Sequence, residues 1–270
     1  METPLEHELD ALKRLLLTMA GEVERSMDLA VRALVERDSD LAQQVIDSDS
    51  VIDQREIEVD HRVIEAIVRD KPLARDLRFV ITAIKIAPDL ERVADHAVNI
   101  AEQAMALNRV PPLKPFITLP QMARTASAMV RDALSAFVNS DAATARAVIA
   151  RDDEVDAMHE QVFRELLTYM MEDPATIPRS LSLLLIARSL ERIADQGTNI
   201  AEQVVYLAEG QDIRHRHGEE PRWAGAERPA DVRHGGVEVD RVARLEFDPV
   251  LAEEEDATAF DDEVELLARV

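Results

Sequence analysis

The sequence predicts an all-α protein made of two tandem three-helix bundles followed by an acidic tail. Three observations predict this fold class: apolar residues recur every three or four positions, prolines and glycines separate these periodic segments, and the second half of the periodic region repeats the first. Of the 270 residues, 47% are hydrophobic, enough for a buried core, and 3% are aromatic, too few for an all-β sandwich. We expect a first bundle at residues 1–108, a proline-rich linker at 109–118, a second bundle at 119–217 and the tail at 218–270.

The first bundle is expected to contain three long helices. The first, over residues 5–35, has a single apolar stripe formed by Leu5, Leu9, Leu12, Leu16, Met19, Val23, Met27, Val31 and Leu34. Asp38 or Ser39 is the expected N-cap of a second helix, which runs to about residue 69. A turn at Pro72 leads into a third helix that ends near residue 107, and Pro88 inside it should remove a backbone hydrogen bond and kink it.

The second bundle begins after a stretch that is too rich in proline for a helix interior. Pro111, Pro112, Pro115 and Pro120 mark this linker. We expect a fourth helix over residues 119–139, a fifth over 141–171, and a sixth that ends near residue 207. Gly210 directly afterwards is the residue type that commonly ends a helix.

The two bundles are copies of one another. Residues 33–53 align with residues 136–156 without a gap, and the residues identical in both are Ala33, Val35, Asp38, Ala42, Val45, Ile46, Asp49 and Asp53. Residues 90–103 match residues 190–203 even more closely. A duplicated three-helix unit implies bundles related by pseudo-twofold similarity.

Composition excludes several functional classes. The net charge of −23 argues against nucleic-acid binding, because phosphate backbones attract basic surfaces. The sequence has no cysteine, no glycine-rich nucleotide loop and no recognisable catalytic constellation, so we expect no enzyme and no organic cofactor. No apolar run reaches the roughly 18 residues that span a bilayer, and the N-terminus lacks the features of a secretory signal. We therefore expect a cytoplasmic protein.

The composition changes again after residue 217. Residues 218–270 hold four of the seven glycines, the only tryptophan and dense runs of Asp and Glu. This composition predicts a disordered acidic tail. Residues 263–270 have the pattern of a short amphipathic helix that docks on another surface, and the alternative is a solvated tail with no partner.

Two of the expected helices carry a stripe of oxygen-bearing side chains away from their apolar face. On a helical wheel each stripe lies within an arc of about 80°. The stripes comprise Glu91, Asp95, Asn99 and Glu102 in the third helix, and Glu191, Asp195, Asn199 and Glu202 in the sixth. Like charges four residues apart destabilise a helix by a few tenths of a kcal/mol, so their duplication calls for a neutralising partner or another role.

The second and fifth helices add two further acidic pairs, Asp49 with Asp53 and Asp152 with Asp156. Both pairs fall on the apolar arc of their helix, which in the second helix includes Ile57 and Ile64.

Helices joined by a tight turn run antiparallel, so each acidic pair should face the stripe of the next helix. The expected opposite neighbours are Asp49 with Asp95, Asp53 with Glu91, Asp152 with Asp195 and Asp156 with Glu191. Each hairpin is thereby predicted to bring four carboxylates to one level, as a candidate metal site.

Four convergent carboxylates suit iron, manganese, magnesium or calcium, whereas zinc usually adds histidine or cysteine. The alternative is that Arg92, Arg192 or Lys85 neutralises the acids on a solvated face. His96 has Gln196 as its counterpart and is expected to be a surface residue. His159, the counterpart of Glu56, is expected to be a supplementary ligand at most.

The segments IKIAPDLERVADHAVNIAE (84–102) and ARSLERIADQGTNIAE (187–202) resemble the two signature helices of the PhoU family of phosphate-uptake regulators. The likeness covers about residues 1–217 and includes the run at 72–78 and YLAEGQDIRH at 206–215. Ala94 and Ala194 stand where the signature often has glycine, and Gln196 replaces a common histidine.

The resemblance implies a two-bundle, commonly dimeric, cytoplasmic protein that damps phosphate uptake and the phosphate-starvation response. The implied partners are the ATPase subunit of a phosphate ABC transporter and a sensor histidine kinase, through which the protein reaches the membrane. The implied cofactor is a multinuclear iron or zinc cluster, and the matching motif positions are Asp49, Asp53, Glu91, Asp95, Asp152, Asp156, Glu191 and Asp195. Two other hypotheses stay open: a carboxylate-rich metal-binding or metal-storage protein without a phosphate role, and a helical adaptor without metal.

Overall fold

The computed structural model describes residues 4–213, and over this range it contains helices and no strand. The elements in chain order are α1 (Pro4–Val35), α2 (Ser39–Asp70), α3 (Ala74–Asn108), α4 (Thr118–Asn139), α5 (Ala142–Ile149), α6 (Asp152–Glu172), the short 3-10 helix η1 (Pro174–Thr176) and α7 (Ile177–Glu209). The predicted all-α class with two three-helix repeats is confirmed, since α1–α3 form one bundle and α4–α7 form the other. The tail expected at 218–270 lies outside the described residues.

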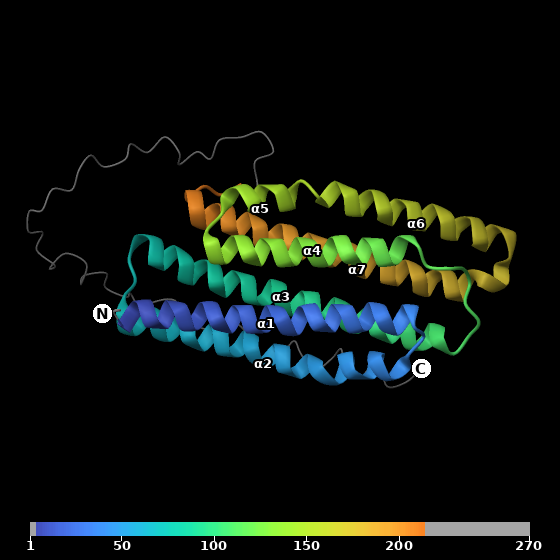
Figure 1. Ribbon diagram of the computed structural model, residues 1–270, viewed down its shortest axis with the longest axis horizontal. Helices are drawn as coiled ribbons and strands as arrows, with labels where there is room; N and C mark the ends of the chain where they lie inside the picture. Colours follow the sequence, from blue (N-terminus) through green and yellow to red (C-terminus); the bar gives the residue numbers. More distant parts are fainter. Residues whose placement is uncertain (1–3, 214–270) are drawn as a thin grey trace, which may run out of the picture. The chain divides into compact units, whose positions relative to one another are not determined.

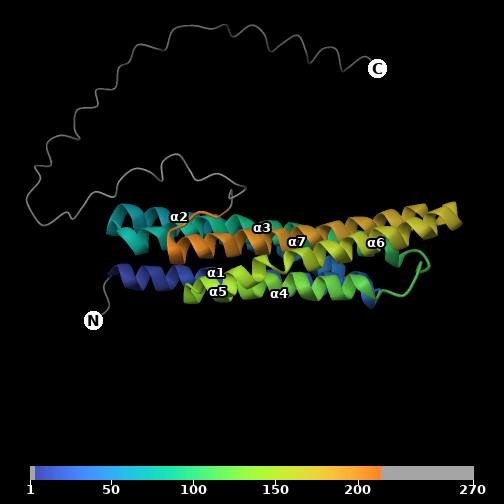
Figure 2. The same ribbon diagram turned by 90° about the horizontal axis from the view of Figure 1, so that it is seen from above.

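The helices of the described unit pack in two layers (Figures 1 and 2). α2, α3, α7 and α6 lie side by side, with α3 and α7 antiparallel in the middle. α1 packs on α2 and α3, and α4 packs on α7, so these two helices cover one face of the four-helix layer. α5 and α6 together run along α7 in the place that α2 takes along α3.

Helix termini follow the local signals that the sequence predicts. Asp38 caps α2 by accepting hydrogen bonds from the backbone N–H groups of residues 40 and 41, at 2.9 and 3.3 Å. Asp141, its counterpart in the repeat, caps α5 in the same way at 3.0 and 3.1 Å. Gly210 ends α7 in the left-handed conformation, with φ of 70°, and donates its N–H to the carbonyl of Tyr206. α3 runs through Pro88 as one helix.

The prediction of a single fifth helix over 141–171 is wrong. A turn at Ala150 and Arg151 separates α5 from α6, whereas α2 is continuous at the corresponding place. Two interactions favour a new helix start here. Asp152, Asp153 and Glu154 fill the first turn of α6, where acidic side chains interact favourably with the helix dipole, and Arg151 forms an ion pair with Asp132 of α4.

α7 approaches α4 very closely at Gly197. A Cβ atom at this position would lie 3.2 Å from the Cβ of Met129 and 3.3 Å from the backbone N of Val130. Glycine therefore removes a clash between two helices. Gly21, in the middle of α1, is a contrast, because a Cβ there would meet no described atom within 4 Å.

These two glycines predict opposite effects of the same substitution. Gly197→Ala should lower the free energy of unfolding by about 1 kcal/mol or more, because the Met129 and Val130 backbone must move. Gly21→Ala should raise it by roughly 0.5–1 kcal/mol, because alanine favours the helix and meets no obstacle. Urea unfolding followed by circular dichroism compares the two variants with the wild type. A stabilising Gly197→Ala would show that α4 and α7 are not in tight contact.

Candidate functional site

The first hairpin brings the acidic residues of α2 and α3 into one electrostatic neighbourhood. Burial raises the pKa of Asp49, and the charges of Asp53 and Asp95 raise it further. Burial likewise raises the pKa of Glu91 to about 7, with additional contributions from Asp95, Glu56 and Asp53. The four predicted side chains of this hairpin therefore lie close enough for like charges to repel one another.

The second hairpin brings together the corresponding residues of α6 and α7. Burial raises the pKa of Asp152, the first residue of α6, and the charges of Asp156 and Asp195 add to the effect. Thr198 on α7 donates its hydroxyl to the Oδ1 atom of Asp152 at 3.3 Å. Glu191 has its Oε2 atom 3.8 Å from Nδ1 of His159.

The two hairpins differ in the cations that pair with their four carboxylates. The first quartet is Asp49, Asp53, Glu91 and Asp95, and the second quartet is Asp152, Asp156, Glu191 and Asp195. Arg92 bonds Asp89 at 3.0 Å, and Asp89 lies outside the first quartet. Lys85 stacks over the ring of Tyr206, 5.5 Å from its centroid. Arg192 does reach the second quartet, since its Nη1 atom lies 3.1 Å from Oδ2 of Asp195. Burial nevertheless keeps the pKa of Asp195 raised, because it outweighs the lowering by Arg192.

Some site residues were not singled out by sequence reasoning. Glu56 lies beside the first quartet, and its pKa is raised by burial and then by Asp60 and Asp53. Glu56 could have been found from the sequence, because it lies three residues after Asp53 and residues at this spacing share a helix face. Thr198, three residues after Asp195, was recognisable by the same spacing.

The prediction of which α2 residues face the core is partly wrong. Ile57 and Ile64 are 55% and 58% exposed. The side chains of α2 that are buried against α1 and α3 include Val45, Ile52 and Val59, which occupy a narrower stripe than the arc of apolar residues. Asp53 is accordingly exposed and Asp49 half-buried, so neither residue points into the core.

The donor chemistry of both hairpins fits a hard divalent cation, because carboxylate oxygens gather there. With the side chains as they lie between residues 4 and 213, no group of three or more His, Asp or Glu residues converges as the ligands of one ion would. Metal binding would therefore require side-chain reorientation and stays a prediction.

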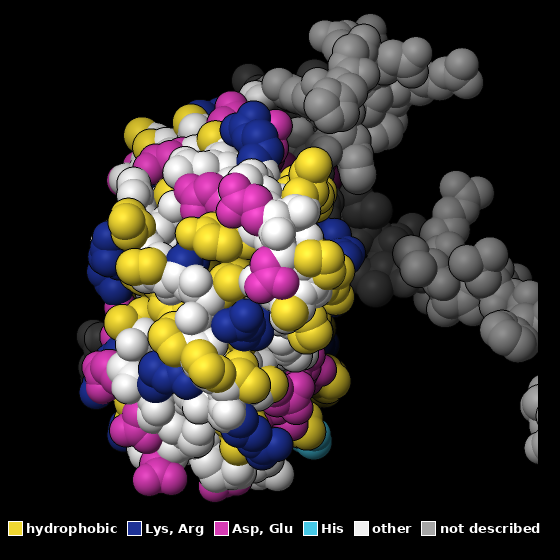
Figure 3. Space-filling model, turned by 90° about the vertical axis from the view of Figure 1, so that its right-hand side faces the viewer, with side chains coloured by type: hydrophobic (Ala, Val, Ile, Leu, Met, Phe, Trp, Pro, Cys, Tyr) yellow, Lys and Arg dark blue, Asp and Glu magenta, His cyan; other side chains and the backbone are white. Residues whose placement is uncertain are grey.

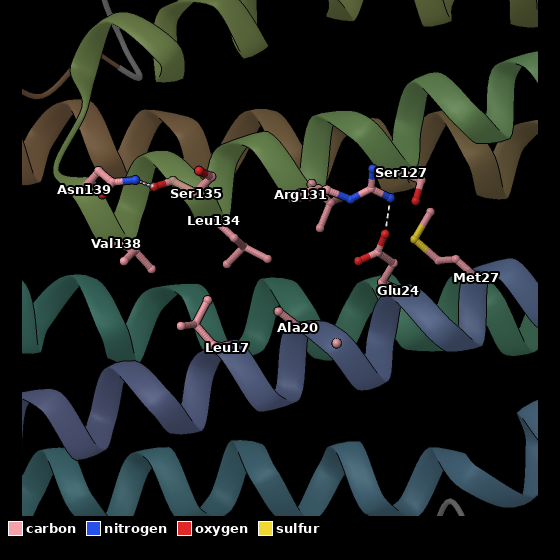
Figure 4. Close-up of a pocket in the computed structure, with 12 residues that line it drawn as sticks. Leu17, Ala20, Glu24, Met27, Ser127, Arg131, Leu134, Ser135, Val138 and Asn139 are labelled. Carbon is pink, nitrogen blue, oxygen red and sulfur yellow. Dashed lines mark hydrogen bonds and ion pairs between the residues drawn. The ribbon is translucent and has the colours of Figure 1, made fainter.

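A hollow of about 330 Å³ lies between α1 and α4, away from the acidic hairpins. Figure 4 shows Leu17 and Leu134 facing it, with Glu24 on α1 paired to Arg131 on α4 across the gap. The ion pair links the two bundles on this side of the molecule.

None of the helices described between residues 4 and 213 combines the length and hydropathy of a membrane-spanning segment.

A duplicated three-helix unit, with matched acidic pairs on facing helices, defines a tandem-repeat helical-bundle protein. The PhoU domain family model matches residues 16–104 and 119–204. The chain belongs to the PhoU domain family.

Curated relatives align over most of their length. The chain is 41% identical over 210 residues to the phosphate-specific transport system accessory protein PhoU homolog of Aquifex aeolicus, covering 78% of this chain and 95% of that protein. It is 37% identical over 213 residues to the phosphate-specific transport system accessory protein PhoU of Escherichia coli K12, covering 79% and 88%.

Solved structures agree with this relationship. The crystal structure of PhoU from Pseudomonas aeruginosa superposes with a TM-score of 0.73 at 40% identity, covering 76% of this chain and 99% of that one. The phosphate transport system regulatory protein PhoU from Streptococcus pneumoniae gives a TM-score of 0.71 at 28% identity, covering 77% and 99%.

The raised pKa of Glu91 predicts a pH-dependent stability. The folded-state value of about 7 lies above the ordinary 4.5, so between these values the folded protein holds a proton that the unfolded chain has lost. Stability should fall as the pH rises through this window and stay lowered above it. Glu91→Gln should remove this fall and stabilise the metal-free protein above pH 7.

Urea unfolding at about pH 5 and about pH 8 measures this effect. Glu65→Gln is the control, because Glu65 is an exposed glutamate on the same hairpin. If Glu91→Gln destabilises the protein at both pH values, Glu91 makes a favourable pairing that outweighs the repulsion.

Proposed function

We propose that this protein is a negative regulator of phosphate uptake and of the phosphate-starvation response. It acts by protein–protein contact in the cytoplasm with the ATPase subunit of a phosphate ABC transporter and with a sensor histidine kinase. The observation that carries the proposal is the relationship to accessory proteins of the phosphate-specific transport system over 78% of this chain and 95% of the Aquifex aeolicus protein. A homodimer is part of this proposal.

The surface of the bundle supports action by contact. Figure 3 shows hydrophobic side chains spread over one end of the molecule, with Lys, Arg, Asp and Glu among them. The segments at this end include Ile117, Met171 and Ile177, which are 77%, 76% and 39% exposed. Exposed apolar patches with polar surroundings are typical of protein interaction sites.

The carboxylate hairpins support a metal-dependent element of this function. Asp49, Asp53, Glu91 and Asp95 would hold a cation in the first repeat, and Asp152, Asp156, Glu191 and Asp195 in the second, with His159 in reach of Glu191. A bound iron, zinc, magnesium or manganese ion would add positive charge to that of Arg92, which lowers the pKa of Glu91 by less than burial and the acidic neighbours raise it. The alternative function, a metal-binding or metal-storage protein without a phosphate role, rests on the same hairpins.

Deletion of the gene tests the regulatory function. In phosphate-rich medium, the deletion strain should take up phosphate faster and express phosphatase that the parent represses, because the damping contact is lost. The wild-type gene on a plasmid should restore both properties. Unchanged uptake together with unchanged phosphatase expression would contradict regulation and favour the storage function.

Membranes from phosphate-rich cells test the contacts themselves. The tagged protein should retain the transporter ATPase and the kinase, and a variant with Ile117→Asp and Met171→Asp should retain less of both. Recovery of neither partner with the wild-type protein would count against the proposed contacts.

A double substitution tests the metal element. Asp53→Asn with Glu91→Gln should lower the iron or zinc content of the purified protein, measured by elemental analysis, while circular dichroism stays unchanged because repulsion is relieved. Asp47→Asn with Glu65→Gln removes two charges from other positions of α2 and should leave the metal content unchanged. Equal metal content in all three proteins would exclude the first hairpin as the metal site.

A further inference from the structure

A hollow of about 360 Å³ lies between α3 and α7, beside the acidic residues Asp95 and Asp195. Its polar lining residues are His96, Asn99 and Gln103 on α3 and Arg188, Ser189 and Arg192 on α7. Each of them carries a side-chain hydrogen-bond donor, and the two arginines carry a full positive charge.

Both arginines of this hollow keep guanidinium N–H groups free to bind a ligand. The Arg188 side chain is exposed and takes part in no hydrogen bond or ion pair within residues 4–213. Arg192 uses one nitrogen, Nη1, to bond Asp195.

The first repeat has a carboxylate at a position where the second repeat has none. Asp89 and Pro88 in α3 occupy the positions that Ser189 and Arg188 occupy in α7. Asp89 is 8% exposed, and its carboxylate accepts a hydrogen bond from Nη1 of Arg92 at 3.0 Å. The first repeat thus supplies its own anion beside its arginine. The second repeat has a hydroxyl in place of that carboxylate and adds a second cation.

We infer that this hollow binds a small tetrahedral oxyanion of the phosphate class, which takes the place that the Asp89 carboxylate has in the first repeat. Guanidinium groups bind phosphate oxygens through paired hydrogen bonds, and the amides of Asn99 and Gln103 and the hydroxyl of Ser189 provide further donors from both helices. A dianion is attracted by the two arginines. The nearby carboxylates of Asp95 and Asp195 offset part of this attraction, and salt screens the remainder, so binding weakens as salt increases. The inference does not depend on the proposed regulatory function.

Calorimetric titration of the purified, chelator-treated full chain with inorganic phosphate, at constant ionic strength, tests the inference. The wild type should bind, and Arg188→Ala should weaken binding at least about tenfold, because charge-assisted hydrogen bonds are lost. Ser189→Asp, which gives α7 the residue of α3, should abolish binding by pairing with the arginines. Arg164→Ala removes the same charge from α6, where Arg164 pairs with Glu160, and should leave the affinity within about twofold.

A second arm separates a free ion from a phosphoryl group on a larger molecule. The second probe is glycerol 2-phosphate. If the open side of the hollow admits an ester, both probes should bind; if it does not, only inorganic phosphate should bind. Either result supports an oxyanion site. The inference is overturned if neither probe binds the wild type, or if Arg188→Ala and Ser189→Asp bind phosphate as tightly as the wild type does. If Ser189→Asp fails to fold, Arg188→Ala decides the outcome alone.

Discussion

The packing of α3 against α7 is the constraint on which the other features of the molecule depend. The helix face of α3 that carries His96 also carries Val93 and Ile100, and the face of α7 that carries Gln196 also carries Ile193 and Ile200. All four aliphatic side chains are 0% exposed. Because these helices occupy the middle of the four-helix layer, they join the two repeats into one unit. The acidic side chains of each hairpin then lie where α2 meets α3 or α6 meets α7, and the hollow lies between α3 and α7.

The two repeats pack in the same way but carry different polar side chains at corresponding positions. Both repeats retain the acidic pairs, but the first places Glu56 where the second places His159. The first repeat places a buried acid, Asp89, where the second has Ser189. Burial raises the pKa of Asp89 to about 6, although Arg92 lowers it. The repeats thus have different charge distributions on one scaffold.

Local signals in the sequence predicted the helices well, because caps, prolines and apolar spacing act within a few residues. Asp38, Asp141 and Gly210 illustrate this for the helix ends. The break between α5 and α6 escaped prediction, because the apolar spacing continues through it while Arg151 reaches across to Asp132 on another helix. The exposure of Ile57 and Ile64 was not predicted either. A helical wheel shows which residues share one face of a helix, but it does not show how many neighbouring helices cover that face.

The sequence by itself determined the all-α class, the duplication and the identity of the acidic residues, because periodicity and repetition are properties of the chain. It also indicated which acids face one another, because a tight turn fixes the antiparallel register of a hairpin. Only the tertiary structure decided which cations meet these acids, how far each carboxyl is buried, and that α3 and α7 border a hollow lined by Arg188 and Arg192. The physical reason is that burial and charge pairing depend on helices far apart in the chain, and their distances are set by packing of the whole unit.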